Sequence, residues 1–292
     1  YFKDDHNNIA VGSIDIDAGN LVLQNNASIE MNSGEVPEGV AVGALDVEAI
    51  NLLRIENSTI SVSAIGAKSA RADVSLSGNY VELTGATIEH VNYFSKVYNQ
   101  GDIYLRDKAE PLFLTGYGTL DITAQATVVS KEDTIISMQN GSINLAAGGM
   151  MLDETSIETE THWLQDSQGR NSQLSLSAVG QLLLLNSRFK METVSSGGRQ
   201  TFITTAPVVQ FKNSKLTLSD EVAGQTGAVL IDGSQSLSIE DSEITSIGMN
   251  TIDAGVNGND ITVGSGAVTV KSSVINTTVL GTGEVGQTKL VV

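Results

Sequence analysis

The sequence predicts an all-β protein folded as a right-handed parallel β-helix, a solenoid of about ten coils with roughly 28 residues and three strands per coil. Two repeating patterns predict this fold. A short alternation of apolar and polar residues recurs mostly every 27 to 32 residues, and a hexapeptide like Ile-Glu-Asp-Ser-Glu-Ile (239–244) recurs with it. Strands of period two without helical patterns between them indicate coils made of β-strands alone.

The first strand of each coil is the most regular element. It begins near positions 13, 44, 73, 102, 119, 142, 173, 228, 260 and 289, with a weaker member at 201. The intervals shorten to 17 and 23 residues around position 119, where one coil is expected to lack its third strand.

A second strand follows four to seven residues later in most coils, and the hexapeptide joins it to a third. Leu53 and Ile55 alternate with polar residues in one such second strand, and Ile60 and Val62 do so in the third strand that follows. One coil alone cannot bury these side chains. Stacking each strand on its equivalent in the previous coil buries all three faces and pairs the backbone, and the chirality of parallel crossovers favours a right-handed coil.

The hexapeptide is expected to form a structural turn column along the rod. Its corner position holds Asn57, Gly85, Asn186, Asn213, Asp241 and Ser272 in different coils. Asn, Asp and Gly tolerate a left-handed backbone at low cost, and the small residue that follows suits a place where two sheets converge. Asn57, Asn186, Asn213 and Asp241 are therefore interpreted as structural rather than as ligand or glycan sites, and stacked Asn and Ser are expected to form hydrogen-bonded ladders.

Composition limits the partners. The chain has 292 residues, a formal net charge of −18 and no Cys. The negative charge argues against nucleic acid and anionic membrane surfaces, and no apolar run approaches the ~18 residues needed for membrane insertion. Without Cys, neither disulfides nor thiolate metal sites contribute to the fold.

The domain organisation is expected to be simple. Residues 1–12 are interpreted as a lead-in or N-terminal edge strand, and residues 13–292 as a single β-helix repeat domain. The chain lacks an initiator Met and closes on Lys-Leu-Val-Val, which reads as the first strand of a further coil. We therefore expect it to be a segment of a longer chain.

Two stretches resemble a known family. The cadence of DITVGSGAVTVKSSVINTTVLGTGEVGQT (260–288) and SIDIDAGNLVLQNNASIEMNSG (13–34) resembles the β-helical repeat region of filamentous haemagglutinin-type exoproteins, large adhesins exported by two-partner secretion. The resemblance implies a Gram-negative rod at the cell surface or in the extracellular space, and an outer-membrane transporter as partner during export. The Asn-Pro-rich signature of the family's N-terminal secretion domain is not found in the chain.

The sequence predicts neither catalysis nor a cofactor. His6, His90 and His162 are expected in the lead-in and in loops, without a nucleophile arrangement beside them. Asp15 and Asp17 are interpreted as solvated surface charge. A weak calcium candidate is formed by Asp253, Asn257, Asn259 and Asp260, but their spacing matches no known calcium loop and favours a solvated turn.

Aromatic residues gather in two connections between coils. Tyr93, Phe94 and Tyr98 lie in one of them, and Trp163 lies in another. Aromatic rings on a rigid scaffold suit recognition of a sugar or a protein, which makes these residues a candidate binding loop. The alternative is that they cover an apolar edge opened by the irregular coil.

The expected function is that of an extracellular or cell-surface adhesive rod, a stalk or fibre segment that binds through protruding loops or neighbouring modules. Its expected partner is a host-cell or matrix receptor, or a polysaccharide. Two alternatives remain from the sequence: a polysaccharide-binding or polysaccharide-cleaving β-helix protein, and a filament subunit that self-associates end to end through unpaired strands.

Overall fold

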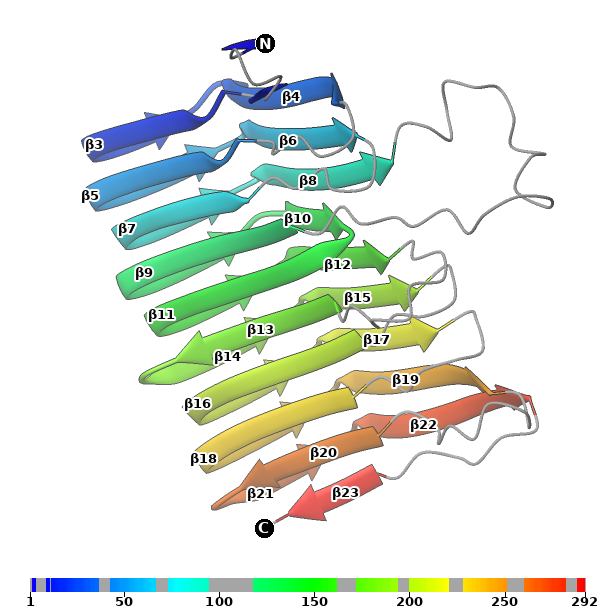
Figure 1. Ribbon diagram of the computed structural model, residues 1–292. Coiled ribbons are helices and arrows are strands. Elements are labelled where there is room, and N and C mark those ends of the chain that lie inside the picture. Colours follow the sequence, from blue (N-terminus) through cyan, green and yellow to red (C-terminus); the bar gives the residue numbers. More distant parts are fainter. Residues whose placement is uncertain are drawn as a thin grey trace, which may run out of the picture.

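Parallel pairing between equivalent strands organises the chain, which stacks from β3 to β23 as a β-solenoid (Figure 1). The computed structural model describes residues 2–3, 9–10, 12–36, 43–66, 73–94, 118–161, 172–193, 200–220, 228–250, 260–281 and 288–291. Strands are the only regular elements in these ranges, so the predicted fold class is confirmed. No helix in these ranges could cross a membrane. One short antiparallel pair, β1 (Phe2–Lys3) with β2 (Ile9–Ala10), precedes the solenoid.

The larger sheet has 12 strands, and all its pairings are parallel. It contains β3 (Ile14–Leu23), β5 (Leu45–Glu56), β7 (Val74–Thr84), β9 (Gly118–Lys131), β11 (Gly141–Asp153), β13 (Ser172–Ala178), β14 (Gln181–Leu185), β16 (Gln200–Lys212), β18 (Ala228–Glu240), β20 (Asp260–Ser265), β21 (Val268–Lys271) and β23 (Thr288–Val291).

The second sheet has 9 strands, one from each complete coil. They are β4 (Ser28–Val36), β6 (Thr59–Gly66), β8 (Thr87–Phe94), β10 (Thr134–Gln139), β12 (Thr155–Thr161), β15 (Arg188–Thr193), β17 (Lys215–Asp220), β19 (Glu243–Asn250) and β22 (Val274–Gly281). The described residues thus form nine coils, and β23 adds a strand of a tenth.

The coil count differs slightly from the prediction: the described residues form nine coils, and the strand expected at 102 lies outside them. β7 pairs directly with β9, from Val74 opposite Leu120 onward, and β8 pairs directly with β10. The coil that contains β7 and β8 is therefore adjacent to the coil that contains β9 and β10. Each described coil contributes a strand to the second sheet, so the expected coil without a third strand is not among them.

The first and second predicted strands of a coil are usually one long strand with a bend. The backbone pairing continues through the bend with a shift of register, for example between Ala49 and Leu52. Only two coils break the strand there, giving β13 with β14 and β20 with β21. The weaker strand predicted at 201 is real and forms the start of β16.

The core consists of columns in which equivalent side chains stack from coil to coil. One continuous column contains Leu23, Ile55, Leu83, Ser130, Leu152, Leu184, Phe211, Ile239 and Val270. Most of its members are fully buried. Phe189, Phe202 and Phe211 form an aromatic cluster with ring centroids 5.7 to 6.4 Å apart, which packs β15 against both halves of β16.

Candidate functional site

The residues of the expected binding loop fall mostly outside the part of the chain that the structure describes. Tyr93 and Phe94 are the last two residues of β8, but their side chains lie outside the described part. Tyr98 and Trp163 lie outside the described residues altogether. Their role in recognition stays a prediction.

The calcium candidates also lie outside the described region. Asp253, Asn257 and Asn259 precede β20, and Asp260 is its first residue, with a side chain that is not described. Among the side chains that are described, no group of 3 or more His, Cys, Asp or Glu is arranged to hold a metal ion.

The corner of the hexapeptide has a left-handed backbone in coil after coil. The φ angle is positive at Asn57, Gly85, Glu154, Asn186, Asn213, Asp241 and Ser272, with values between 46° and 53°. The first and fourth coils place two such residues in succession, at 25–26 and at 132–133. The sequence did not predict the left-handed backbone at Glu154, Glu132 and Asp133. Glu is a weaker turn signal than Asn, and it occupies the first corner position in both coils.

Serine hydroxyls at the next position link the coils. Ser214 Oγ donates to the carbonyl oxygens of Leu184 (3.0 Å) and Lys212 (2.9 Å), and it accepts from the backbone N–H of Ser187 (3.1 Å). Ser242 accepts in the same way from the N–H of Ser214, and Ser273 from that of Ser242. The expected ladder therefore exists, and it satisfies buried backbone groups along one edge of the rod.

A second, exposed ladder runs beside the serines. Asn213 Nδ2 donates to Asn186 Oδ1 at 3.2 Å, and Asn186 Nδ2 donates to Asp153 Oδ1 at 2.7 Å. These three side chains are therefore engaged with each other along the rod axis.

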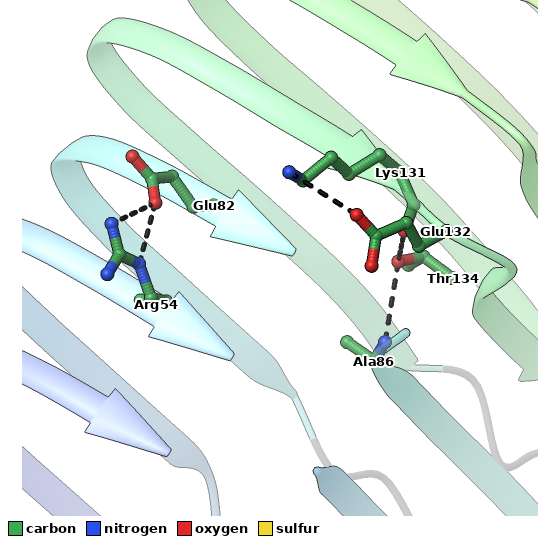
Figure 2. A network of polar contacts seen from close by, with 6 residues as sticks. All are labelled: Arg54, Glu82, Ala86, Lys131, Glu132 and Thr134. Carbon is green, nitrogen blue, oxygen red and sulfur yellow. Dashed lines mark hydrogen bonds and ion pairs between the residues drawn. The ribbon is translucent and has the colours of Figure 1, made fainter. Parts of the chain in front are cut away.

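An ion pair on the outer face also connects two neighbouring coils (Figure 2). Arg54 Nη2 lies 2.6 Å from Glu82 Oε2, across the β5–β7 pair. At the nearby corner, Thr134 Oγ1 donates to the Lys131 carbonyl at 2.7 Å and accepts from the Ala86 N–H at 3.4 Å. An exposed ion pair such as Arg54–Glu82 contributes little stability. The buried Thr134 hydroxyl takes the place of the serine hydroxyl found in other coils.

His90 lies in the core, which corrects its expected place in a loop. It occupies β8 with Val62 and Met138 as neighbours in the adjacent strands, and its side chain is 0% exposed. Neither ring nitrogen has a hydrogen-bond partner among the described residues. Burial lowers the pKa of His90 to about 4, against a smaller raising effect of the Asp73 charge, so the ring is neutral at pH 7.

An acid-lined hollow of about 390 Å³ lies on the outer face of the second sheet. Its ionisable side chains are Glu89, Glu158, Glu160, Lys190 and Glu192. Lys190 Nζ pairs with Glu192, and this hydrogen bond raises the pKa of Lys190 above its usual value. Glu160 accepts from Gln139 Nε2 at 3.2 Å, so these carboxylates are engaged with neutral or cationic partners.

A groove of about 620 Å³ follows the bend of the larger sheet across β5, β7, β9, β11, β13 and β16. Its floor is a stacked column of small residues, Ala49, Gly78, Ala124, Ala147 and Ala178. One wall carries outward side chains such as Ser77, Thr123 and Ser177, and the other carries bend residues such as Ile50 and Val179. This volume lies in the range of ligand sites, about 300 to 1,000 Å³.

Sequence reasoning missed this groove, although a signal for it was present. Each first alternation ends in a small residue, from Ala18 to Gly233, where the two halves of the strand converge. A larger side chain would not fit inside that angle. A column of alanine and glycine at one position of a solenoid therefore marks a sharp bend.

Comparisons with protein-family models, curated proteins and solved structures find no match to this chain. The fold therefore defines the class: the chain is a parallel β-solenoid repeat protein with a long groove along one edge.

Proposed function

We propose that the chain is a rigid adhesive rod, a stalk or fibre segment of a secreted or surface-exposed bacterial adhesin of the filamentous haemagglutinin type. The observation that carries the proposal is the unbroken stack of nine coils, in which backbone ladders and core columns run the length of the described chain. Two-partner secretion and an extracellular location belong to this proposal, and they are supported by the strand cadence of residues 13–34 and 260–288.

The stack favours a mechanical role. Each coil is held to its neighbours by parallel backbone pairing and by apolar side chains in register, and a column of serine hydroxyls adds to this from Ser187 to Ser273. Such a solenoid resists bending because any local kink breaks several ladders at once. It can present loops or neighbouring modules at a distance from the cell.

Adhesion can be tested with fluorescent microspheres coated with the purified chain. We expect retention on epithelial monolayers or immobilised matrix proteins several-fold above spheres coated with a globular protein of similar negative charge. Retention no higher than that control on every surface would overturn the adhesive function.

The aromatic residues near the end of β8 give a sharper version of this test. Replacing Tyr93, Phe94 and Tyr98 by Ser should abolish retention and leave the melting temperature unchanged if these residues bind a receptor. A large fall in melting temperature would instead assign them to packing.

A second candidate is a polysaccharide-binding or polysaccharide-cleaving protein, and the acid-lined hollow around Lys190 favours it. Carboxylates beside a cationic side chain are a common arrangement for acid–base chemistry on sugars. Incubation with neutral and anionic polysaccharides, followed by an assay for new reducing ends and for retention, tests this candidate. Cleavage that is lost in Glu160→Gln and Glu192→Gln would support it.

A further inference from the structure

The bend beside the groove alternates in length from one coil to the next. Two residues separate the small floor residue from the next core residue in one coil, and three in the following coil. The two-residue bends are 19–20, 79–80, 148–149, 207–208 and 266–267, and the three-residue bends are 50–52, 125–127, 179–181 and 234–236. The described solenoid therefore has a repeat of two coils at this edge.

This alternation shapes one wall of the groove. The three-residue bends project Ile50, Gln125 and Val179 into solvent, and Ile50 and Val179 are 70% and 83% exposed. The shorter bends between them line the groove with Asn79 and Gly148, which are only half-exposed. Tyr80, the second residue of one shorter bend, is 48% exposed but does not line the groove. With strands about 4.8 Å apart, the projections recur every two strands, or about 9.6 Å.

A polyproline II helix has a matching period. Its three residues per turn at a rise of about 3.1 Å give about 9.3 Å per turn. Ile50, Gln125 and Val179 project at two successive intervals along the wall. Over these two intervals, the length of two polyproline II turns differs from the spacing of the projecting residues by only about 0.6 Å. An extended β-strand repeats every two residues, about 6.7 Å, and this period does not match the spacing of about 9.6 Å between the projecting residues.

The chemistry of the lining agrees with such a peptide. The backbone of a polyproline II helix has no internal hydrogen bonds, so its carbonyls seek donors. Ser77, Thr123, Ser177, Asn79 and Gln125 supply hydroxyl and amide groups along both walls. Among the described residues that line the groove, Glu48 at one end is the only ionisable one, and none is aromatic. The lining therefore offers no aromatic surface for sugar rings or for proline rings. A bound peptide is held instead by hydrogen bonds, by the apolar Ile50 and Val179 and by a basic residue opposite Glu48.

We propose that this groove binds a proline-rich segment of a partner protein in the polyproline II conformation, lying along the rod axis, with a basic residue beside Glu48. The proposal rests on the adhesive function and names the chemistry of one receptor segment. The occupant spans roughly seven to nine residues, because the groove crosses six strands.

The test uses the whole chain and a fluorescein-labelled peptide of one arginine followed by nine prolines, with binding measured by fluorescence anisotropy. Saturable binding is expected for this peptide, and binding at least tenfold weaker is expected for a peptide in which alternating Gly and Ser replace the prolines. Equal binding of both peptides would overturn the proposal. So would displacement by chitohexaose or cellohexaose but not by unlabelled proline peptide, because the groove would then be a sugar site.

A matched pair of variants places the binding in the groove. Ser177 and Ser175 are both outward, half-buried residues of β13, but only Ser177 lines the groove. Ser177→Gln should weaken proline-peptide binding at least tenfold, whereas Ser175→Gln should leave it unchanged, with equal melting temperatures for both. Equal effects of the two variants would contradict the assignment. Adhesion without proline-peptide binding would overturn the assignment of the groove and leave the proposed adhesive function standing. Peptide binding without adhesion would overturn the adhesive function and leave the assignment of the groove standing.

Discussion

His90 places an ionisable ring in the apolar interior, and this makes stability depend on pH. Its pKa is about 4 in the folded chain, below the ordinary value of 6.5 that applies once the chain unfolds. The unfolded state therefore binds the proton more readily. The free energy of unfolding that depends on a neutral His90 is fully present above about pH 6.5. It is lost as the pH falls towards 4, and the loss totals about 3 kcal/mol.

The variant His90→Met should remove this pH dependence. Met occurs in the same column at Met138 and Met191, so the side chain suits the site. Urea unfolding at pH 7.5 and pH 5 should show a smaller loss of free energy of unfolding for the variant than for the parent chain. Carboxylate titration affects both proteins alike, so equal losses in the two would show that His90 is not the sensing group.

Ser214 illustrates what one hydroxyl does for two coils. Ser214→Ala removes the acceptor of the buried Ser187 N–H, which then has no partner in the wall of the core. We expect the free energy of unfolding to fall by about 1 to 3 kcal/mol. Ser175→Ala is the control, because this outward serine is outside the ladder, and its effect should stay within about 0.5 kcal/mol. Similar effects of both substitutions would argue against the ladder.

At the scale of the strand, the bend depends on close backbone approach. A Cβ on Gly148 would lie 2.6 Å from the Ala126 carbonyl oxygen, whereas a Cβ on Gly149 would meet nothing within 4 Å. Gly148→Ala should therefore cost about 1 to 3 kcal/mol, because backbone cannot move aside easily. Gly149→Ala should be neutral or stabilising by up to about 1 kcal/mol. Thermal melting of the two variants checks this, and an equal shift in both would show that the bend tolerates a wider backbone spacing.

The strands themselves follow from the sequence, but their bends do not. Period-two alternation with a turn residue every coil is a local signal, and it predicts the two halves of β5 on either side of its bend and the start of β6. Whether two alternations form two strands or one bent strand depends on how neighbouring coils pair across the bend. The strand predicted at 102 lies outside the described residues, and it is not a rung between β7 and β9 because these two strands pair directly.

The candidate sites show the same limit. The small residues of the groove floor are visible in the sequence, but the groove exists only when Ala124, Ala147 and Ala178 are stacked. His90 was misplaced because the long insertion after β8 made its surroundings look like a loop. His90 lies two residues after Ile88, which points into the core, and side chains two residues apart in a strand share a face. This spacing predicts a buried position for His90.

At the scale of the whole molecule, stability is expected to be a sum of coils and of contacts between adjacent coils. Each coil pairs with its two neighbours and not beyond, as the order of both sheets shows. The consequence is that coils should be removable, provided that the new neighbours fit each other.

Deletions that join equivalent positions test this together with the two-coil repeat. Thr201 and Asp260 occupy equivalent positions two coils apart, so removing residues 202–260 joins Thr201 to Ile261 without changing the register. The bend at 179–181 then lies beside the bend at 266–267. A three-residue bend then still neighbours a two-residue bend. Removing only residues 202–228 joins Thr201 to Val229 and places two three-residue bends side by side.

Both deletions remove Phe202 and Phe211, so they lose the same part of the aromatic cluster. The smaller deletion should nevertheless melt at the lower temperature, because two projecting bends only about 4.8 Å apart crowd each other. The larger deletion should keep cooperative melting and the mean residue ellipticity of the full chain in circular dichroism. If the chain that lacks one coil melts higher than the chain that lacks two, the alternation of bends has no energetic role, and the wall of the groove is an incidental result of insertions.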